Sequence, residues 1–356
     1  MWHLHNNKLI DDEVYGSCKG KTGSKALITL QLLADHSRVW KKNLILLFNN
    51  AAGCYDRIPP ALAEIALRRV GVPKQITKAH TNAQRKMKHH IKTAIGVSTG
   101  YIQCGNVSKR IIIEGLITLL AGIIGGIGQG GRASPIIWLV ILLIMMKVYR
   151  MTQEGAIVED SITKEKIPLH IISYVDNNSI VRHFERKETV ATMMEKIKEN
   201  IGEWQKLLQL MGGDLSLDKC KVTVMKWYQN GEWGRIKLKK KTKEDDKLIM
   251  TSIKNVNQEE LLERLDPNDA ERVLGIRLPL DGSMTAELAF RKKQLKTFCT
   301  ALYKSPLTQK EAYSAYQSRY KSIATYPYTV TIFTTRELAK IQKDSLNLLL
   351  PKLGIN

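Results

Sequence analysis

The chain has 356 residues and carries 55 Lys and Arg against 34 Asp and Glu, a formal net charge of +21. This length can bury a sizeable core and predicts two or three subdomains, and the apolar share of 44% argues against a disordered chain. The excess of positive charge favours a polyanionic partner such as nucleic acid, because each neutralised phosphate releases condensed counterions. A basic surface of the ribosomal type is the alternative that charge alone leaves open.

The five cysteines are scattered, odd in number, and form no C-x-x-C pair or spacing typical of zinc sites. The sequence therefore predicts neither a disulfide framework nor a structural zinc. The N-terminal residues lack the apolar stretch of a signal peptide. We expect an intracellular protein, cytoplasmic or nuclear, that is not secreted.

The first part of the chain alternates helical and extended patterns. Residues 24–40 have apolar positions at helical spacing, and residues 43–48 form a short apolar run suited to a strand buried on both faces. Pro59-Pro60 predicts the start of a helix over residues 61–70.

A strongly basic segment covers residues 74–92. It fits a solvated helix face and a phosphate-binding surface equally well, and the candidate nucleic-acid contacts in it are Arg85, Lys86 and Lys88. Further on, a glycine-rich turn at 125–132 precedes an apolar run at 136–146. This run is too short to span a bilayer, so we predict a buried helix that begins near Ser134-Pro135, and no membrane association.

The second half continues with residues 169–175 as a strand and residues 179–183 as its hairpin partner. Asp176-Asn177-Asn178 has the composition of the turn between them. A helix over 188–211 ends at Gly212-Gly213, residues 237–243 suit an exposed loop, and helical patterns fill residues 284–356. The predicted fold class is α+β, with an antiparallel sheet at the centre.

Several segments, in this order along the chain, resemble the motifs of reverse transcriptases. The sequences of these segments most closely resemble the reverse-transcriptase-like genes of eukaryotic mobile elements that lack ribonuclease H and integrase. The resemblance covers about residues 12–280, and the tail follows it loosely. The matching segments are Tyr15–Lys21 (YGSCKGK), Phe48–Pro59 (FNNAAGCYDRIP), Gly128–Pro135 (GQGGRASP), Tyr174–Asn177 (YVDN), Gly213–Cys220 (GDLSLDKC) and Leu274–Ile276 (LGI).

The resemblance implies a right-hand polymerase palm, an antiparallel sheet with helices on one face, together with partial fingers and a helical thumb. The parts would be residues 1–43 as partial fingers, 44–280 as palm with finger elements inserted at about 73–130, and 281–356 as a thumb-like region. Family fingers usually begin further upstream of the Tyr15 segment, so we expect a fragment or a shortened gene product.

The resemblance also implies an RNA-directed DNA polymerase, a nucleotidyltransferase that binds an RNA or DNA primer-template and dNTP. Two Mg²⁺ or Mn²⁺ ions would be held at positions 50, 176 and 177. Tyr55 would contact the ribose, unless it is a core aromatic, and Lys219 would serve as proton donor or charge partner, unless it only faces solvent. The remaining roles are nucleotide binding by Gln129, Gly130, Lys19 and Lys21, and a primer grip at Gly275.

Only Asp176 is acidic among the three implied metal positions, since Asn50 and Asn177 occupy the other two. An amide brings no net charge, and a unit charge about 4 Å from a divalent ion is worth up to roughly 8 kcal/mol at an effective dielectric near 20. We therefore expect an inactive or nearly inactive polymerase. Two Asp-to-Asn changes favour deliberate inactivation over decay, although Asn49 and Asn178 also fit drift towards asparagine. The alternative is a non-catalytic nucleic-acid-binding scaffold.

Overall fold

The computed structural model describes residues 4, 6–7, 9–52, 54–55, 57–86, 88–89, 101–102, 133–229, 236–238, 248–251 and 259–355. The fold is of the mixed α/β class. The chain forms two compact units. The first comprises Met1–Thr22, Leu44–Val222 and Thr242–Arg264, and the second Gly23–Asn43, Thr223–Lys241 and Leu265–Asn356. The boundaries of these two units differ from those of the predicted fingers, palm and thumb. That division into three parts stays a prediction.

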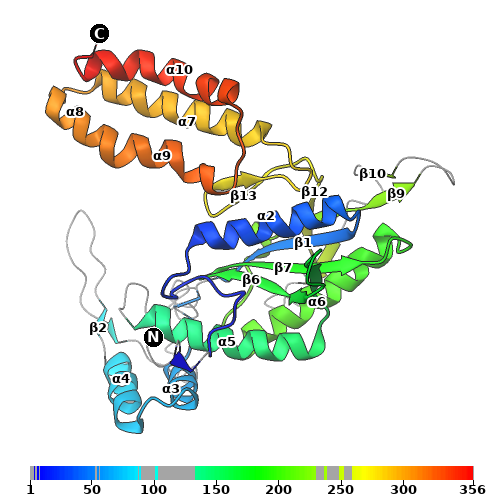
Figure 1. The fold of residues 1–356 in the computed structure, drawn as a ribbon. Coiled ribbons are helices and arrows are strands. Elements are labelled where there is room, and N and C mark those ends of the chain that lie inside the picture. Colours follow the sequence, from blue (N-terminus) through cyan, green and yellow to red (C-terminus); the bar gives the residue numbers. More distant parts are fainter. Residues whose placement is uncertain are drawn as a thin grey trace. The chain divides into compact units, whose positions relative to one another are not determined.

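A six-stranded sheet in the order β11-β12-β8-β1-β7-β6 is the framework around which the first unit is built (Figure 1). Strand β1 lies inside the sheet and is buried from Asn43 through Asn49, as its apolar sequence predicted. The division between the two units falls within β8. The strands are β1 (Asn43–Asn50), β6 (Ile171–Tyr174), β7 (Asn177–Phe184), β8 (Lys221–Met225), β11 (Leu248–Thr251) and β12 (Glu259–Leu265).

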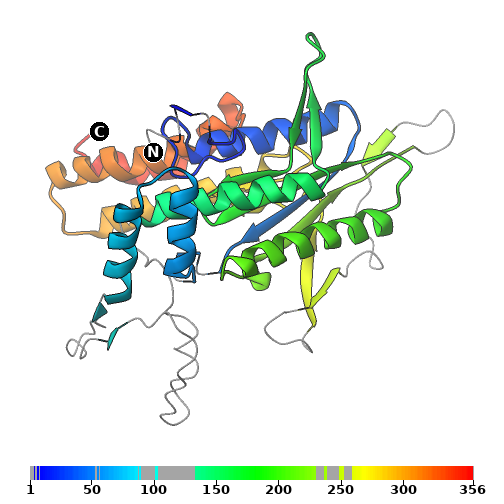
Figure 2. The same ribbon diagram turned by 90° about the horizontal axis from the view of Figure 1, so that it is seen from below.

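Helices α5 (Ser134–Thr152) and α6 (Val190–Leu210) lie side by side against one face of these strands (Figures 1 and 2). Buried polar side chains tie the layers together: Arg182 of β7 donates to the Asn200 Oδ1 at 2.7 Å, and Asn200 donates to the Tyr149 hydroxyl at 2.9 Å. Within the described residues, α5 is the one helix long and apolar enough to cross a membrane, and half of it is buried. A core helix passes the same test, so this property identifies no membrane span.

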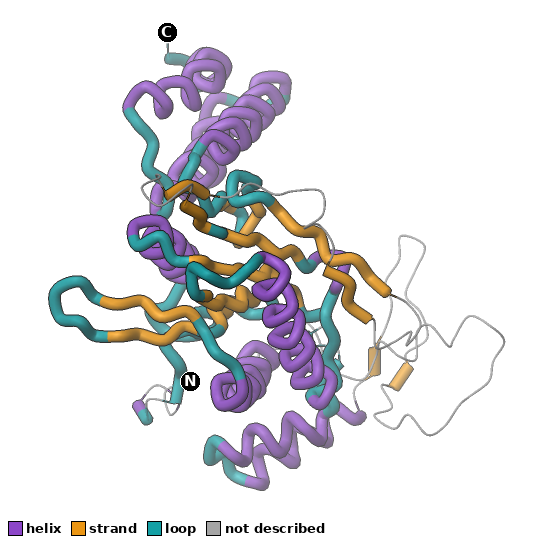
Figure 3. The backbone as a smooth tube through the Cα atoms, turned by 90° about the vertical axis from the view of Figure 1, so that its right-hand side faces the viewer, coloured by secondary structure: helices purple, strands orange, loops and turns teal. Residues whose placement is uncertain are grey.

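Shorter elements complete the first unit. Pro60 opens α3 (Pro60–Arg69) at the position where its missing N–H costs nothing, as predicted. The hairpin of β4 (Ala156–Glu159) and β5 (Lys166–Leu169) projects from the sheet in Figure 3. The other elements are α4 (Lys74–Lys86), β2 (Lys88–His89), β3 (Tyr101–Ile102) and the 3₁₀ turn η1 (Leu217–Lys219).

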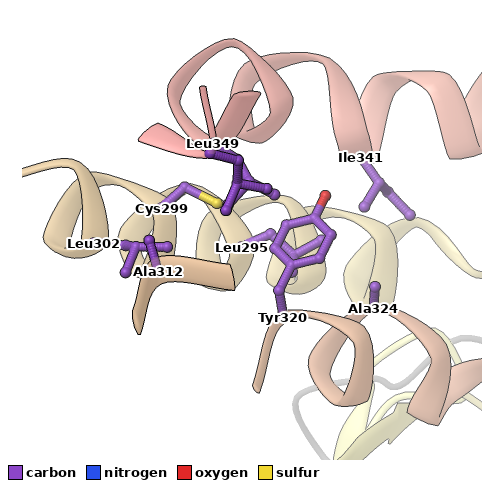
Figure 4. Packing of buried hydrophobic residues seen from close by; sticks show 9 residues of the cluster. Leu295, Cys299, Leu302, Ala312, Tyr320, Ala324, Ile341 and Leu349 are labelled. Carbon is purple, nitrogen blue, oxygen red and sulfur yellow. The ribbon is translucent and has the colours of Figure 1, made fainter. Parts of the chain in front are cut away.

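The second unit is mainly helical towards its C-terminal end, as predicted for residues 284–356. Its core packs Leu295, Cys299 and Tyr320 against Ile341 and Leu349 (Figure 4). The helical elements are α2 (Gly23–Val39), α7 (Thr285–Lys304), α8 (Gln309–Ala315), the π-helix η3 (Tyr316–Tyr320), α9 (Lys321–Thr325), η4 (Tyr326–Thr329) and α10 (Thr335–Lys352). Two hairpins belong to it, β9 (Trp227–Gln229) with β10 (Ile236–Leu238), and β13 (Glu271–Val273) with β14 (Ile276–Leu278).

Two local predictions were wrong. Tyr174 pairs with Asn177, so the β6–β7 turn consists of Val175 and Asp176, while Asn177 and Asn178 already belong to β7. Their polar side chains suggested a turn, but strand pairing includes them. The expected loop at 237–243 begins as strand β10, because residues 236–238 pair with β9. Residues 239–243 and the glycine-rich 125–132 lie outside the described residues.

Candidate functional site

Three of the predicted site positions meet where β1 ends and the β6–β7 hairpin turns. Asn50 is the last residue of β1, Asp176 is the second turn residue, and Asn177 opens β7. The Asn50 Nδ2 donates to the Asn177 Oδ1 at 3.4 Å, and the Asn177 Nδ2 donates to the Asp176 Oδ1 at 3.2 Å. The fold therefore links positions 50, 177 and 176 in one chain of side-chain hydrogen bonds.

Backbone hydrogen bonds join the end of β1 to the hairpin turn and to the segment around Ser216. The Ala51 N–H donates to the Asp176 carbonyl at 3.0 Å, which fixes the end of β1 against the hairpin turn. On the other side, the Ser216 N–H donates to the Asn50 carbonyl at 3.0 Å. The neighbourhood of Asn50 is thus determined by main-chain contacts, so its position does not depend on its own amide group.

Asp214 is an acidic residue near this site that sequence reasoning did not single out. Its carbonyl accepts from the Ala52 N–H at 2.8 Å, and its side chain is buried with one carboxylate oxygen 3.7 Å from the Arg57 guanidinium. The sequence could have indicated Asp214, because it lies within the segment Gly213–Cys220 that resembles a family motif. Because Arg57 and the Leu215 N–H already engage its carboxylate, it serves to join the segments.

Tyr55 lies close enough to Asp176 for the two to interact electrostatically. Burial raises the pKa of Tyr55 to about 12, and the charges of Cys54 and Asp176 add to the increase. The tyrosine residue is half-buried. The structure therefore places Tyr55 within electrostatic range of Asp176. The neighbouring Asp56 lies outside the described residues.

The three predicted lysines have different surroundings. Lys219 is exposed at the end of η1, and Lys19 is exposed in the N-terminal segment. Lys21 donates to the Asp11 carbonyl at 2.7 Å and lies 3.6 Å from the Asp12 carboxylate. Within the described part of the chain, no hydrogen bond or ion pair joins these lysines to Asp176.

The remaining candidates of the first unit are only partly described. Arg85 and Lys86 belong to the last turn of α4 and Lys88 to β2, but their side chains are outside the described part. Gln129 and Gly130 also lie outside it. Their predicted roles in nucleic-acid and nucleotide binding stay predictions.

Gly275 belongs to the second unit, where it forms the β13–β14 turn with Leu274. Both residues have positive φ, 48° at Leu274 and 87° at Gly275, a combination that suits a tight hairpin. The Tyr326 hydroxyl donates to the Leu274 carbonyl at 2.7 Å, and Arg291 donates to the Gly275 carbonyl at 2.6 Å. The buried carboxylate of Glu287 pairs with Arg291, so the side chain that binds the Gly275 carbonyl is itself fixed by an ion pair.

The donor set at Asn50, Asp176 and Asn177 does not fit a pair of magnesium ions. Mg²⁺ prefers anionic oxygen ligands in an octahedral shell, and Asp176 alone supplies a carboxylate here. The amide NH₂ groups of Asn50 and Asn177 donate to the oxygens that a cation would need. The described residues also contain no cluster of three or more His, Cys, Asp or Glu side chains suited to a metal.

No protein-family model and no curated protein matches the sequence. Among solved structures, the fold is similar to telomerase from Candida tropicalis in complex with a TWJ fragment of telomeric RNA, at 12% identity and a TM-score of 0.39, covering 99% of this chain and 52% of that one. Apo telomerase from the same organism gives the same identity and TM-score, with 98% and 52% covered. Telomerase from Candida albicans with the TWJ fragment gives 13%, 0.34, 99% and 51%. The chain thus spans about half the length of these structures.

Proposed function

We propose that the chain is the palm-and-thumb part of a reverse transcriptase-like polymerase that binds primer-template but has lost nucleotidyl transfer. The observation that carries the proposal is the meeting of Asn50, Asp176 and Asn177 at one strand end and one hairpin turn. The sequence resemblance assigns metal-binding carboxylates to these same positions. Tyr55, which the resemblance assigns to the ribose, lies within electrostatic range of Asp176.

The loss of activity follows from charge. A two-metal site needs several negative ligands to offset two divalent ions, and these positions retain one carboxylate. The amides preserve the shape and the hydrogen bonding of the site while they remove its charge. Nucleic-acid binding does not depend on these groups, because the net charge of +21 acts on phosphates wherever they lie along the surface.

In this proposal, residues 1–43 are partial fingers, residues 44–280 are the palm with inserted finger elements, and residues 281–356 are the thumb. The partners are an RNA or DNA primer-template and dNTP. Gln129, Gly130, Lys19 and Lys21 bind the nucleotide, and Lys219 acts on the pyrophosphate. Arg85, Lys86, Lys88 and Gly275 contact the nucleic acid.

The test is primer extension on an RNA template with Mg²⁺ or Mn²⁺. The chain as given is compared with the Asn50→Asp, Asn177→Asp double variant, called here the restored variant. Asp176→Asn added to the restored variant is the matched control, since it removes one carboxylate without changing shape. We expect extension by the restored variant alone. Extension by the chain as given would contradict the proposed inactivity.

A non-catalytic nucleic-acid-binding scaffold is the second candidate, favoured by the charge of the chain and by the poor fit of the site to metal ions. It predicts that all three proteins bind primer-template with the same affinity and the same steep dependence on salt, and that none extends the primer. Primer extension by the restored variant would contradict the scaffold hypothesis, because it would show that the fold supports nucleotidyl transfer once the two carboxylates are present.

A further inference from the structure

The turn that carries Asp176 has a conformation that its own sequence disfavours. Val175 has a φ of 60°, in the left-handed region that β-branched residues rarely enter. Asp176 is not among the residues with positive φ, and a two-residue hairpin turn with positive φ at its first central position alone normally has glycine there. Val175 therefore needs contacts from outside the turn to stay in this conformation.

Helix α5 supplies the first contact. Trp138 is almost fully buried, and its indole Nε1–H donates to the Val175 carbonyl at 2.7 Å. This hydrogen bond fixes the orientation of the peptide group between Val175 and Asp176, because a buried indole has little freedom to follow a carbonyl that rotates away.

The N-terminal segment supplies the second contact. A Cβ atom on Gly16 would lie 2.5 Å from the Val175 backbone nitrogen and 2.8 Å from its Cγ2, so the Gly16 backbone packs directly against Val175. No side chain fits between them. Val175 thus packs against the Gly16 backbone, and its carbonyl accepts a hydrogen bond from Trp138.

The N-terminal segment is itself firmly held. Val14 forms a parallel bridge to Ser173, with the Tyr15 N–H donating to the Ser173 carbonyl and the Ser173 N–H donating to the Glu13 carbonyl, both at 2.9 Å. The buried carboxylate of Glu13 accepts from the His170 N–H and from the Arg150 guanidinium.

Arg150 also pairs with Asp11 at 2.7 Å. Because Arg150 and Trp138 both belong to α5, the same helix anchors both contacts to the turn.

We propose that Trp138 and Gly16 are positioning residues, which hold Val175 in the left-handed conformation and so fix Asp176 beside Asn50 and Asn177. The pair is called the turn clamp below. Its effect on catalysis rests on the proposed function, whereas its effect on the geometry of the turn does not.

The geometric test uses the chain as given. Crystal structures are compared for Trp138→Phe, for Val175→Gly and for both changes together. We expect Trp138→Phe alone to move residue 175 out of the left-handed region and to break the Asn50–Asn177 hydrogen bond. Glycine adopts positive φ freely, so the combination with Val175→Gly keeps both features. A Trp138→Phe structure with residue 175 unchanged overturns the clamp.

The matched control is Trp204→Phe. Trp204 is fully buried in α6, and its Nε1 has no hydrogen-bond partner among the described residues. This change therefore removes the same atoms from a core without removing a contact to the turn. We expect it to leave residue 175 and the Asn50–Asn177 hydrogen bond in place.

The kinetic test uses the restored variant. Trp138→Phe is expected to lower kcat by about 10- to 100-fold with little change in KM for the template, because misplacing a reacting group by about 1 Å has an effect of that size. Adding Val175→Gly is expected to recover most of kcat, and Trp204→Phe to leave it nearly unchanged. Equal losses from Trp138→Phe and Trp204→Phe, or no recovery with Val175→Gly, would overturn the proposal.

Gly16→Ala is the second variant, and it covers the case in which Trp138→Phe does not fold. Gly202→Ala is its control, since a Cβ there meets nothing within 4 Å. We expect kcat of the restored variant to fall with Gly16→Ala alone. If the restored variant itself shows no extension, the proposed function fails while the crystal structures still decide whether the clamp exists.

Discussion

The Asn50 Nδ2 donates a hydrogen bond of 3.4 Å to the Asn177 Oδ1 across 127 positions of sequence. Asn177 in turn donates to the Asp176 Oδ1, so each amide NH₂ group is hydrogen-bonded to the oxygen of the next side chain. Positions 50, 177 and 176 thus present two amides and one carboxylate, joined by side-chain hydrogen bonds.

Introducing carboxylates at positions 50 and 177 should make the folded chain depend on divalent ions. In EDTA, Asn50→Asp with Asn177→Asp is expected to lower the free energy of unfolding by about 1–2 kcal/mol, because partly exposed like charges repel through screened interactions. Millimolar Mg²⁺ should reverse the loss by binding the folded state. Urea unfolding with and without Mg²⁺ measures both effects.

The control for that experiment is Asn268→Asp with Asn347→Asp, two exposed positions that give the same change in net charge. It should show no response to Mg²⁺ beyond that of the chain as given. An equal response of the two double variants would mean that Mg²⁺ acts on overall charge and not on the site.

The hydroxyl of Tyr55 reports the charge at Asp176. Its pKa is raised to about 12, chiefly by burial and further by Cys54 and Asp176. The folded state therefore holds this proton more tightly than the unfolded chain, and the contribution of Tyr55 to stability falls as pH rises from about 10 towards 12. We expect Asp176→Asn to lower the pKa of Tyr55.

The measurement is the tyrosinate absorbance of each protein minus that of its Tyr55→Phe version, which isolates one tyrosine among 12. Asp160→Asn, at the tip of the β4–β5 hairpin, removes a charge that is not among the causes of the Tyr55 shift. If both substitutions changed the Tyr55 titration equally, the interaction with Asp176 would be refuted.

The buried ion pair between Glu287 and Arg291 should contribute far more to stability than the exposed pair between Lys292 and Asp344. Arg291→Ala leaves the fully buried Glu287 carboxylate without its cation, and we expect the free energy of unfolding to fall by about 3–5 kcal/mol. Lys292→Ala removes an exposed pair with Asp344 and should cost less than about 1 kcal/mol. Urea unfolding compares the two, and similar losses would contradict the assigned role of Arg291.

The helical end of the second unit should depend on its buried core. Leu295 is fully buried against Cys299, Tyr320 and Ile341, so Leu295→Ala is expected to lower the free energy of unfolding by about 2–5 kcal/mol. Ile332 is 88% exposed, and Ile332→Ala should change the free energy of unfolding by less than about 0.5 kcal/mol. Thermal unfolding monitored by circular dichroism tests the difference, and a Leu295→Ala loss within the range of Ile332→Ala would show that this core is not formed.

Several elements followed from local sequence alone. The apolar run at 43–48, the double proline at 59–60 and the helical spacing at 24–40 each predicted the element that forms, as did the apolar residues of α5 and the glycines after α6. These features act within a few residues, through backbone sterics and the side on which apolar groups fall, so the sequence by itself determined them.

Only part of the candidate site could be predicted from the sequence. Family resemblance indicated positions 50, 176 and 177, but the turn was placed on Asp176-Asn177-Asn178, because these residues are favoured in turns and valine is not. Trp138 and Gly16, which lie against Val175 in the fold, carried no local signal that would have moved the turn to Val175-Asp176.

What only the tertiary structure decided is therefore the conformation of Val175 and the meeting of Asn50 with Asn177. Both depend on contacts between segments far apart in the chain, where buried hydrogen bonds and close packing outweigh the preference of a single residue. Local sequence determined several of the strands and helices, and long-range packing decided where β7 begins and which side chains face one another at the strand ends.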